Sequence, residues 1–109
     1  MLRFLLLAAL VLAVAVPLHA QTSAQNPALH KLFADEWERG LRESPEGATY
    51  NGDNRFNDRW SDFSLPAIAA RAEADRAALQ ALHAIDRKTL SAADQLDYDT
   101  FEWSLLRGI

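Results

Sequence analysis

The side chains of this sequence that could do chemistry stand far apart. A zinc site in a protein needs His, Asp or Glu ligands that converge, often with two histidines one helical turn apart. The histidines are His19, His30 and His83, each is followed by Ala or Lys, and the sequence therefore contains no His-Glu pair. We predict that none of them is a metal ligand, and that each is a surface or half-buried residue.

Acidic residues gather after residue 90, at Asp94, Asp97, Asp99 and Glu102. Metal binding or acid–base catalysis is one interpretation, but Asp94 is better explained as part of a helix cap, where negative charge is favourable. The oxygen-rich run 51–58 lacks the ligand spacing and the closing Glu of a calcium loop. No serine lies in a nucleophile elbow, and no glycine loop of the phosphate-binding kind is present. The residues alone predict no catalytic, metal-binding or cofactor-binding position.

Three helices are expected to position these side chains. The first extends from about Ala28 to Glu43, with Asn26 as its cap and a proline at its first position. The second follows a cap at Ser64 and is rich in alanine, a strong helix former. The third follows Ser91, in a sequence that resembles a capping box. The residues expected to face the core are Leu29, Leu32, Phe33, Trp37 and Leu41, then Ile68, Ala72, Leu79, Leu82 and Ile85, then Leu96, Tyr98, Phe101, Trp103 and Leu105.

The predicted fold class is therefore all-α, with about three antiparallel helices and one long packed loop between the first two. No alternation of the kind seen in strands appears after residue 20. The loop, SPEGATYNGDNRFNDRW at 44–60, carries two glycines and a proline, yet also Tyr50, Phe56 and Trp60. Flexible linkers rarely hold three aromatic residues. The segment either binds something or fills a gap between helices.

The first twenty residues have the layout of a secretory signal peptide. Arg3 precedes an apolar run from Phe4 to Val16, which is shorter than the roughly 20 residues that span a bilayer. We predict a signal peptide helix at 1–20, cleaved after Ala20, with cleavage after Ala24 as an alternative. A polar lead at 21–27 and a helical segment at 28–109 follow. The protein is thus expected to be exported to the periplasm or secreted, with no stable membrane anchor after cleavage.

Charge and cysteine content narrow the possible partners. The formal net charge is −4, and it becomes −5 without the first twenty residues, whose single charged side chain is Arg3. An acidic chain lacks the electrostatic footprint that binds nucleic acid or an anionic membrane surface. Since the chain has no cysteine, it forms neither disulfides nor thiolate metal sites. Its stability must come from core burial, which is marginal at this length.

Several short patterns occur in a familiar order, and together they resemble the N-terminal part of the bacterial domain of unknown function 885 family. The likeness covers about residues 28–106. The patterns are Pro45-Glu46-Gly47-Ala48-Thr49-Tyr50-Asn51-Gly52, then Arg59, Trp60, Asp62 and Ser64, then Ala84-Ile85-Asp86, Leu90-Ser91 and Gln95-Leu96-Asp97-Tyr98-Asp99. No one of them is specific, whereas the ordered set is hard to reach by chance.

The resemblance implies a larger, mostly helical and exported parent that is similar to zinc metallopeptidases of the zincin type. In such an enzyme zinc polarises the scissile carbonyl and activates water, with a Glu as general base. The zinc-binding His-Glu helix of that family lies far downstream of the part that this chain resembles. Zinc is therefore expected only in a full-length parent, and the chain alone is predicted to be inactive.

The resemblance also favours a structural role for the loop over a substrate channel. Pro45 would end the first helix, and Gly47 and Gly52 would supply turn conformations closed to other residues. Trp60 and the other aromatic side chains would be buried against the body of the enzyme. The polar residues of the loop would fix its end: Asp62 and Ser64 would cap the second helix, and Arg59 would pair with Asp58 or Asp62.

Two hypotheses follow. In the first, the chain is the N-terminal fragment of an exported zincin-like hydrolase, and the partner of its helices is the remainder of the parent polypeptide. In the second, it is a small exported all-α binding module that docks a helical partner through the wide apolar face of its third helix. A stub from a truncated gene is not distinguished from the first hypothesis by the residues.

Overall fold

The computed structural model describes residues 24–109. The predicted signal peptide at 1–20, its cleavage after Ala20 and the beginning of the polar lead lie outside the described residues. Within them the chain is helical and contains no strand, so the predicted all-α class is confirmed. The elements are α1 (Pro27–Glu43), α2 (Pro45–Tyr50), the 3₁₀ turn η1 (Asn54–Phe56), α3 (Leu65–His83), the 3₁₀ turn η2 (Arg87–Thr89) and α4 (Ala92–Gly108).

The three long helices begin where their caps predict. The side-chain oxygens of Asn26, Ser64 and Ser91 each accept a hydrogen bond from the backbone N–H three residues later, over 3.0, 3.4 and 3.1 Å. Each bond satisfies one of the N–H groups that the first turn of a helix leaves without a partner. These boundaries are set by local chemistry, which is why the sequence predicts them closely.

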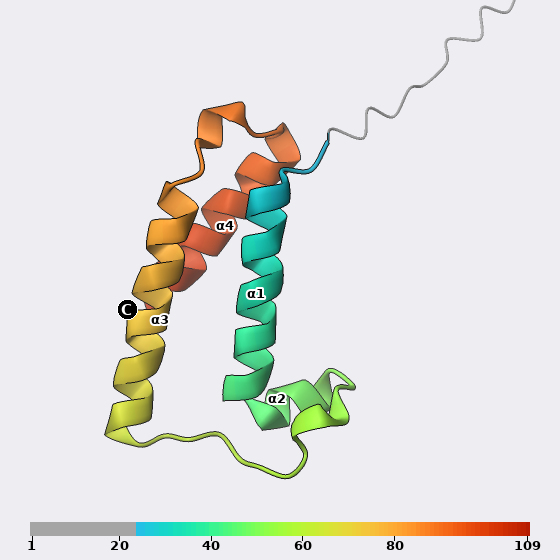
Figure 1. The fold of residues 1–109 in the computed structure, drawn as a ribbon, viewed down its shortest axis with the longest axis vertical. Coiled ribbons are helices and arrows are strands. Elements are labelled where there is room, and N and C mark those ends of the chain that lie inside the picture. Colours follow the sequence, from blue (N-terminus) through green and yellow to red (C-terminus); the bar gives the residue numbers. More distant parts are fainter. Residues whose placement is uncertain (1–23) are drawn as a thin grey trace, which may run out of the picture.

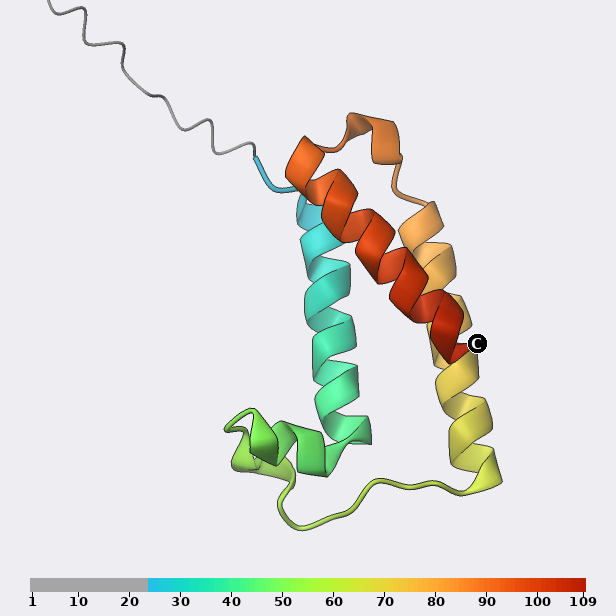
Figure 2. The ribbon, with the colours of Figure 1, turned by 180° about the vertical axis from the view of Figure 1, so that it is seen from behind.

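The long helices form an open, three-helix arrangement (Figure 1). α1 and α3 run in opposite directions, and α4 runs back against α3, so the predicted antiparallel order is confirmed. Seen from behind, α4 crosses diagonally from the beginning of α1 to the middle of α3 (Figure 2). The other halves of α1 and α3 are bridged by α2 and the segment that leads to α3.

The core lies where the three long helices meet. Phe33 of α1 packs edge-on against Phe101 of α4, with ring centroids 5.0 Å apart. Leu29 and Leu82 are completely buried beside them. The other buried members of the cluster are Ala78, Leu90, Tyr98 and Leu105, with Leu32, Leu79 and Ile85 packed against it.

Four residues that the sequence assigned to the core are instead exposed. Leu96 and Trp103 are 67% and 60% exposed, because α4 turns its Asp94, Tyr98, Phe101 and Leu105 side inward and these two residues outward. Trp37 and Ile68 are exposed as well, at 58% and 47%. They lie on α1 and α3 outside the central cluster of buried residues.

No helix among residues 24–109 is both long and apolar enough to cross a membrane.

Candidate functional site

The predicted loop at 44–60 is not a continuous loop. α1 ends at Glu43, and Pro45, which is buried, opens the short helix α2 rather than a coil. Proline is well suited to the first position of a helix, where its fixed φ matches and its missing N–H is not needed. Gly52 has φ +85°, so the prediction that it supplies a turn is confirmed. The same prediction for Gly47 is wrong, because Gly47 lies inside α2.

The polar residues before α3 fix the path of the chain. Arg59 Nε donates to Asp58 Oδ1 over 3.4 Å, which is one of the two predicted pairings. Asp62 Oδ1 accepts from the N–H of Ser64 over 2.8 Å, and this bond lowers the pKa of the Asp62 carboxyl. Ser64 caps α3 as predicted, whereas Asp62 holds the cap residue rather than the helix itself.

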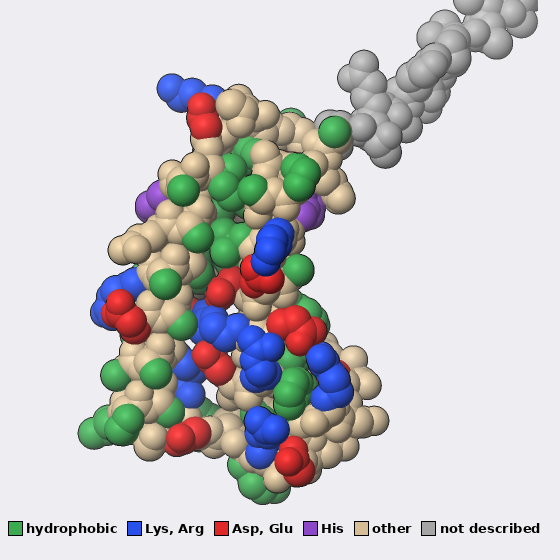
Figure 3. Space-filling model, in the orientation of Figure 1, with side chains coloured by type: hydrophobic (Ala, Val, Ile, Leu, Met, Phe, Trp, Pro, Cys, Tyr) green, Lys and Arg blue, Asp and Glu red, His purple; other side chains and the backbone are tan. Residues whose placement is uncertain are grey.

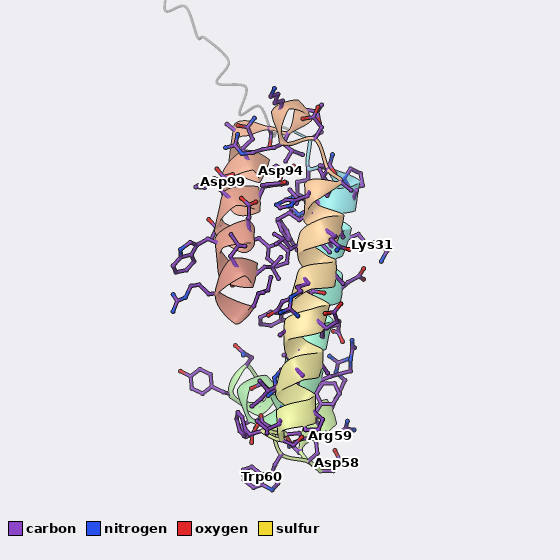
Figure 4. All side chains as sticks on the ribbon, turned by 90° about the vertical axis from the view of Figure 1, so that its left-hand side faces the viewer. Lys31, Asp58, Arg59, Trp60, Asp94 and Asp99 are labelled. Carbon is purple, nitrogen blue, oxygen red and sulfur yellow. The ribbon has the colours of Figure 1, made fainter. Side chains whose placement is uncertain are left out.

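The aromatic side chains of this segment do not plug the core of the described residues. Trp60 and Tyr50 are 83% and 92% exposed within residues 24–109, and their burial against the body of a larger enzyme stays a prediction. Figure 4 shows Trp60, with Asp58 and Arg59, at the end of the molecule away from Asp94. Phe56 is half-buried, with the guanidinium groups of Arg55 and Arg59 at 5.2 and 5.4 Å from its ring centroid.

One polar cluster joins α1 to α3. Arg39 donates to Glu36 over 2.9 Å, to Glu43 over 3.0 and 3.1 Å, and to Asp75 across the helix pair. Burial opposes the charge of Arg39, but its hydrogen bonds to Glu36, Asp75 and Glu43 raise its pKa further above the usual range. These carboxylates are all held by one guanidinium, so the cluster fastens the two helices and offers no group poised for proton transfer.

A second polar cluster joins α1 to α4. Asp94 is only 2% exposed; its Oδ2 accepts from the N–H of Asn26 over 2.7 Å, and its Oδ1 lies 2.8 Å from His30 Nε2. The hydrogen bond with His30 and then that from Asn26 lower the pKa of Asp94. The sequence does not predict this pair, because it shows His30 as the one histidine of its helix and gives it no partner nearby in the chain. Within residues 24–109 the recorded side-chain contacts of His30 are Asp94 and the ring of Phe33, so the pair joins α1 to α4.

Zinc does not fit the described residues. Between residues 24 and 109 no group of three His, Cys, Asp or Glu side chains converges to hold a metal ion. His83 lies 2.5 Å from Glu102 on the outer side of α3 and α4, and the Asp94 carboxylate is already engaged by His30 and Asn26.

A family model described as "Bacterial protein of unknown function (DUF885)" matches residues 45–109. The chain belongs to this family. No curated protein and no solved structure matches the chain. The match to DUF885 includes α2, α3 and α4, but it begins after α1. α1 nevertheless supplies Leu29 to the core, Arg39 to the ion pair with Asp75 and His30 to the hydrogen bond with Asp94. In this chain the segment that matches DUF885, residues 45–109, therefore packs against α1 and forms polar contacts with it.

Proposed function

We propose that residues 28–109 are the N-terminal helical segment of an exported zinc-dependent peptidase or related hydrolase of the DUF885 family. In this proposal the segment packs against the catalytic part of its parent and does no chemistry itself. The likeness of the family to zincin-type metallopeptidases supports the enzyme class, and the layout of residues 1–20 supports export.

The observation that carries the proposal is the outer face of α4. Its apolar side chains Leu96, Trp103 and Leu106 are 67%, 60% and 56% exposed, and we call these three residues the outer α4 face. The guanidinium of Arg107 lies 4.6 Å from the ring centroid of Trp103, so a positive charge lies beside the apolar side chains of the outer α4 face. Neighbouring large apolar side chains on one helix are typical of an interaction surface. The remainder of the parent polypeptide is the proposed occupant.

Leu106→Glu tests this proposal in two contexts. In the 109-residue chain the substitution should change the free energy of unfolding by less than about 0.5 kcal/mol, because Leu106 is exposed there. In the longer parent polypeptide the same charge would be buried without a partner, and we expect a loss of about 2 kcal/mol or more. Denaturant unfolding of both proteins, with and without the substitution, gives the comparison.

Ala77→Glu is the matched control, since it places the same charge at an exposed alanine of α3. A small effect of Leu106→Glu in both contexts would contradict docking within one polypeptide. If the reading frame ends after Ile109, docking would have to be to a separate helical partner, as in a small exported binding module.

A further inference from the structure

A groove lies at the open end of the pair formed by α1 and α3, away from the outer α4 face. Its volume is about 330 Å³, and it is lined by the end of α1, the segment before α3 and the first half of α3. Each of these three segments contributes one arginine: Arg42, Arg59 and Arg71. Figure 3 shows Lys and Arg side chains in the hollow between α1 and α3, with Asp and Glu side chains between them. Since the chain as a whole is acidic, this concentration of cations does not follow from composition.

The two carboxylates that line the groove are already engaged. Glu43 accepts two hydrogen bonds from Arg39, at 3.1 and 3.0 Å, which direct its charge toward the middle of the helix pair. Asp62 accepts the N–H of Ser64 over 2.8 Å. The lining thus carries three arginines against these two carboxylates, which leaves an excess of one positive charge.

The arginines are held in place by contacts that use few of their donors. Arg71 Nη1 donates to the backbone carbonyl of Asp62 over 2.7 Å. Arg59 uses Nε on Asp58, while Arg42 comes no closer than 3.8 Å to a carboxylate oxygen of Glu38. A guanidinium carries five N–H donors in a rigid fork. Beyond the contacts that the structure records, each of the three therefore has donors for a ligand.

Trp60 adds an apolar wall to this charged groove. Its side chain is 83% exposed and lines both this groove and a neighbouring hollow of about 450 Å³ that includes Pro45 and Thr49. On the opposite side the groove is lined by Ala67 and Ala70, whose small side chains leave room. An aromatic plane beside several guanidinium groups suits a ligand with an anionic group next to an apolar or peptide part.

We propose that this groove binds the carboxylate of a peptide, with the adjoining peptide group or side chain against Trp60. Guanidinium groups match carboxylates in planar, two-bond geometry, and arginines from three separate segments line this groove. The carboxylate is either the C-terminus of the peptide or an acidic side chain. The site is independent of the outer α4 face, so its test does not depend on the proposed hydrolase.

Trp60 itself reports on binding. The chain has three tryptophans, and Trp37 and Trp103 are exposed, so the double variant Trp37→Phe, Trp103→Phe leaves Trp60 as the sole tryptophan with little structural change. The full 109-residue chain with these substitutions is titrated with N-acetyl-trialanine, with its C-terminal amide, and with an amidated peptide of the same length whose central residue is glutamate. We expect Trp60 fluorescence to respond to at least one of the two carboxylate peptides, and the pattern of response identifies the source of the carboxylate.

Charge-matched variants locate the site. Arg71→Gln and Arg42→Gln should each weaken binding about tenfold, because a charge-assisted hydrogen bond is lost. Arg76→Gln removes the same charge from α3 outside the groove and should leave binding nearly unchanged. Among residues 24–109 the recorded side-chain contact of Arg42 is the 3.8 Å ion pair with Glu38, so its variant tests binding even if Arg71→Gln loosens the segment at Asp62. Equal binding of the neutral amide, equal weakening by Arg76→Gln, or no response to any peptide would overturn the proposal.

Discussion

At the scale of single residues, Asp94 has two roles: one that its neighbours in the sequence predict, and one that depends on the tertiary structure. The sequence explains Asp94 by the cap at Ser91, and the Ser91 hydroxyl does accept the N–H of Asp94. The Asp94 carboxylate, however, reaches α1 and holds Asn26 and His30, which are 68 and 64 residues away. The carboxylate therefore joins the beginnings of two helices.

Asp94→Asn should destabilise the chain. The amide keeps the shape of the side chain but loses the charge that strengthens both hydrogen bonds, and its NH₂ group faces a donor on one side. We expect the melting temperature to fall by about 5 °C or more, a large shift for a chain of this size. Asp97→Asn is the control, since it removes the same charge from an exposed position of α4. Similar melting temperatures for the two variants would contradict this role of Asp94.

The same carboxylate predicts a pH dependence. Its pKa in the folded chain lies below the ordinary value of 3.8, so it stabilises the fold above that pH and the contribution is lost as the pH falls through the folded pKa. The stability difference between the wild-type chain and Asp94→Asn should therefore shrink as the pH falls below 3.8. Melting curves of both proteins across this range measure it. A difference that grows on acidification would show that the sign is wrong.

Among the residues of the candidate site, the sequence predicts the structural roles of those whose partners are close in sequence. Ser64 as a cap and the turn at Gly52 follow from propensity within four residues. The pair of Arg39 with Asp75 spans 36 residues, and no local pattern indicates which of many acidic side chains an arginine will meet. The three-arginine groove has the same origin, since its members lie on separate segments.

At the scale of elements, α4 shows the limit of apolar periodicity. Tyr98, Phe101 and Leu105 form one stripe, and Leu96 with Trp103 forms another on the opposite side. The sequence predicted that both stripes face inward. In the described chain α4 packs against α1, α3 and η2, so one stripe is buried and the other remains outside. Which stripe faces the core depends on the crossing direction of α4, and periodicity does not encode that direction.

The end of α4 approaches α3 closely. A Cβ added at Gly108 would collide with the carboxylate of Asp75, which is held by Arg39, whereas a Cβ at Gly40 in α1 meets nothing within 4 Å. Gly40→Ala should therefore stabilise the chain by about 0.5–1 kcal/mol, the usual gain inside a helix. Gly108→Ala should destabilise it by about 1 kcal/mol, as overpacking does.

Denaturant unfolding of the two glycine variants measures both changes. Because each variant adds one methyl group to a helix, the pair separates helix propensity from the contact with Asp75. An equal gain for both substitutions would show that α4 does not end against Asp75.

At the scale of the whole molecule, the prediction of export concerns residues that the structure does not describe. A protein that passes the bacterial export machinery loses its signal peptide at a defined bond. We expect N-terminal sequencing of the exported protein to begin at Gln21, or at Gln25 if cleavage follows Ala24. Retention of Met1 on protein recovered from the periplasm or the medium would contradict cleavage.

We propose that this helical chain is the leading part of a larger DUF885 hydrolase. Membership of the family follows from the match over residues 45–109, while the fold brings together ion pairs, an open groove and an exposed apolar face but no metal-binding group within residues 24–109. Reading the coding DNA beyond the codon for Ile109 tests the claim most directly. We expect an open frame of several hundred codons that encodes a His-Glu zinc motif; a stop codon directly after Ile109 would contradict the proposal.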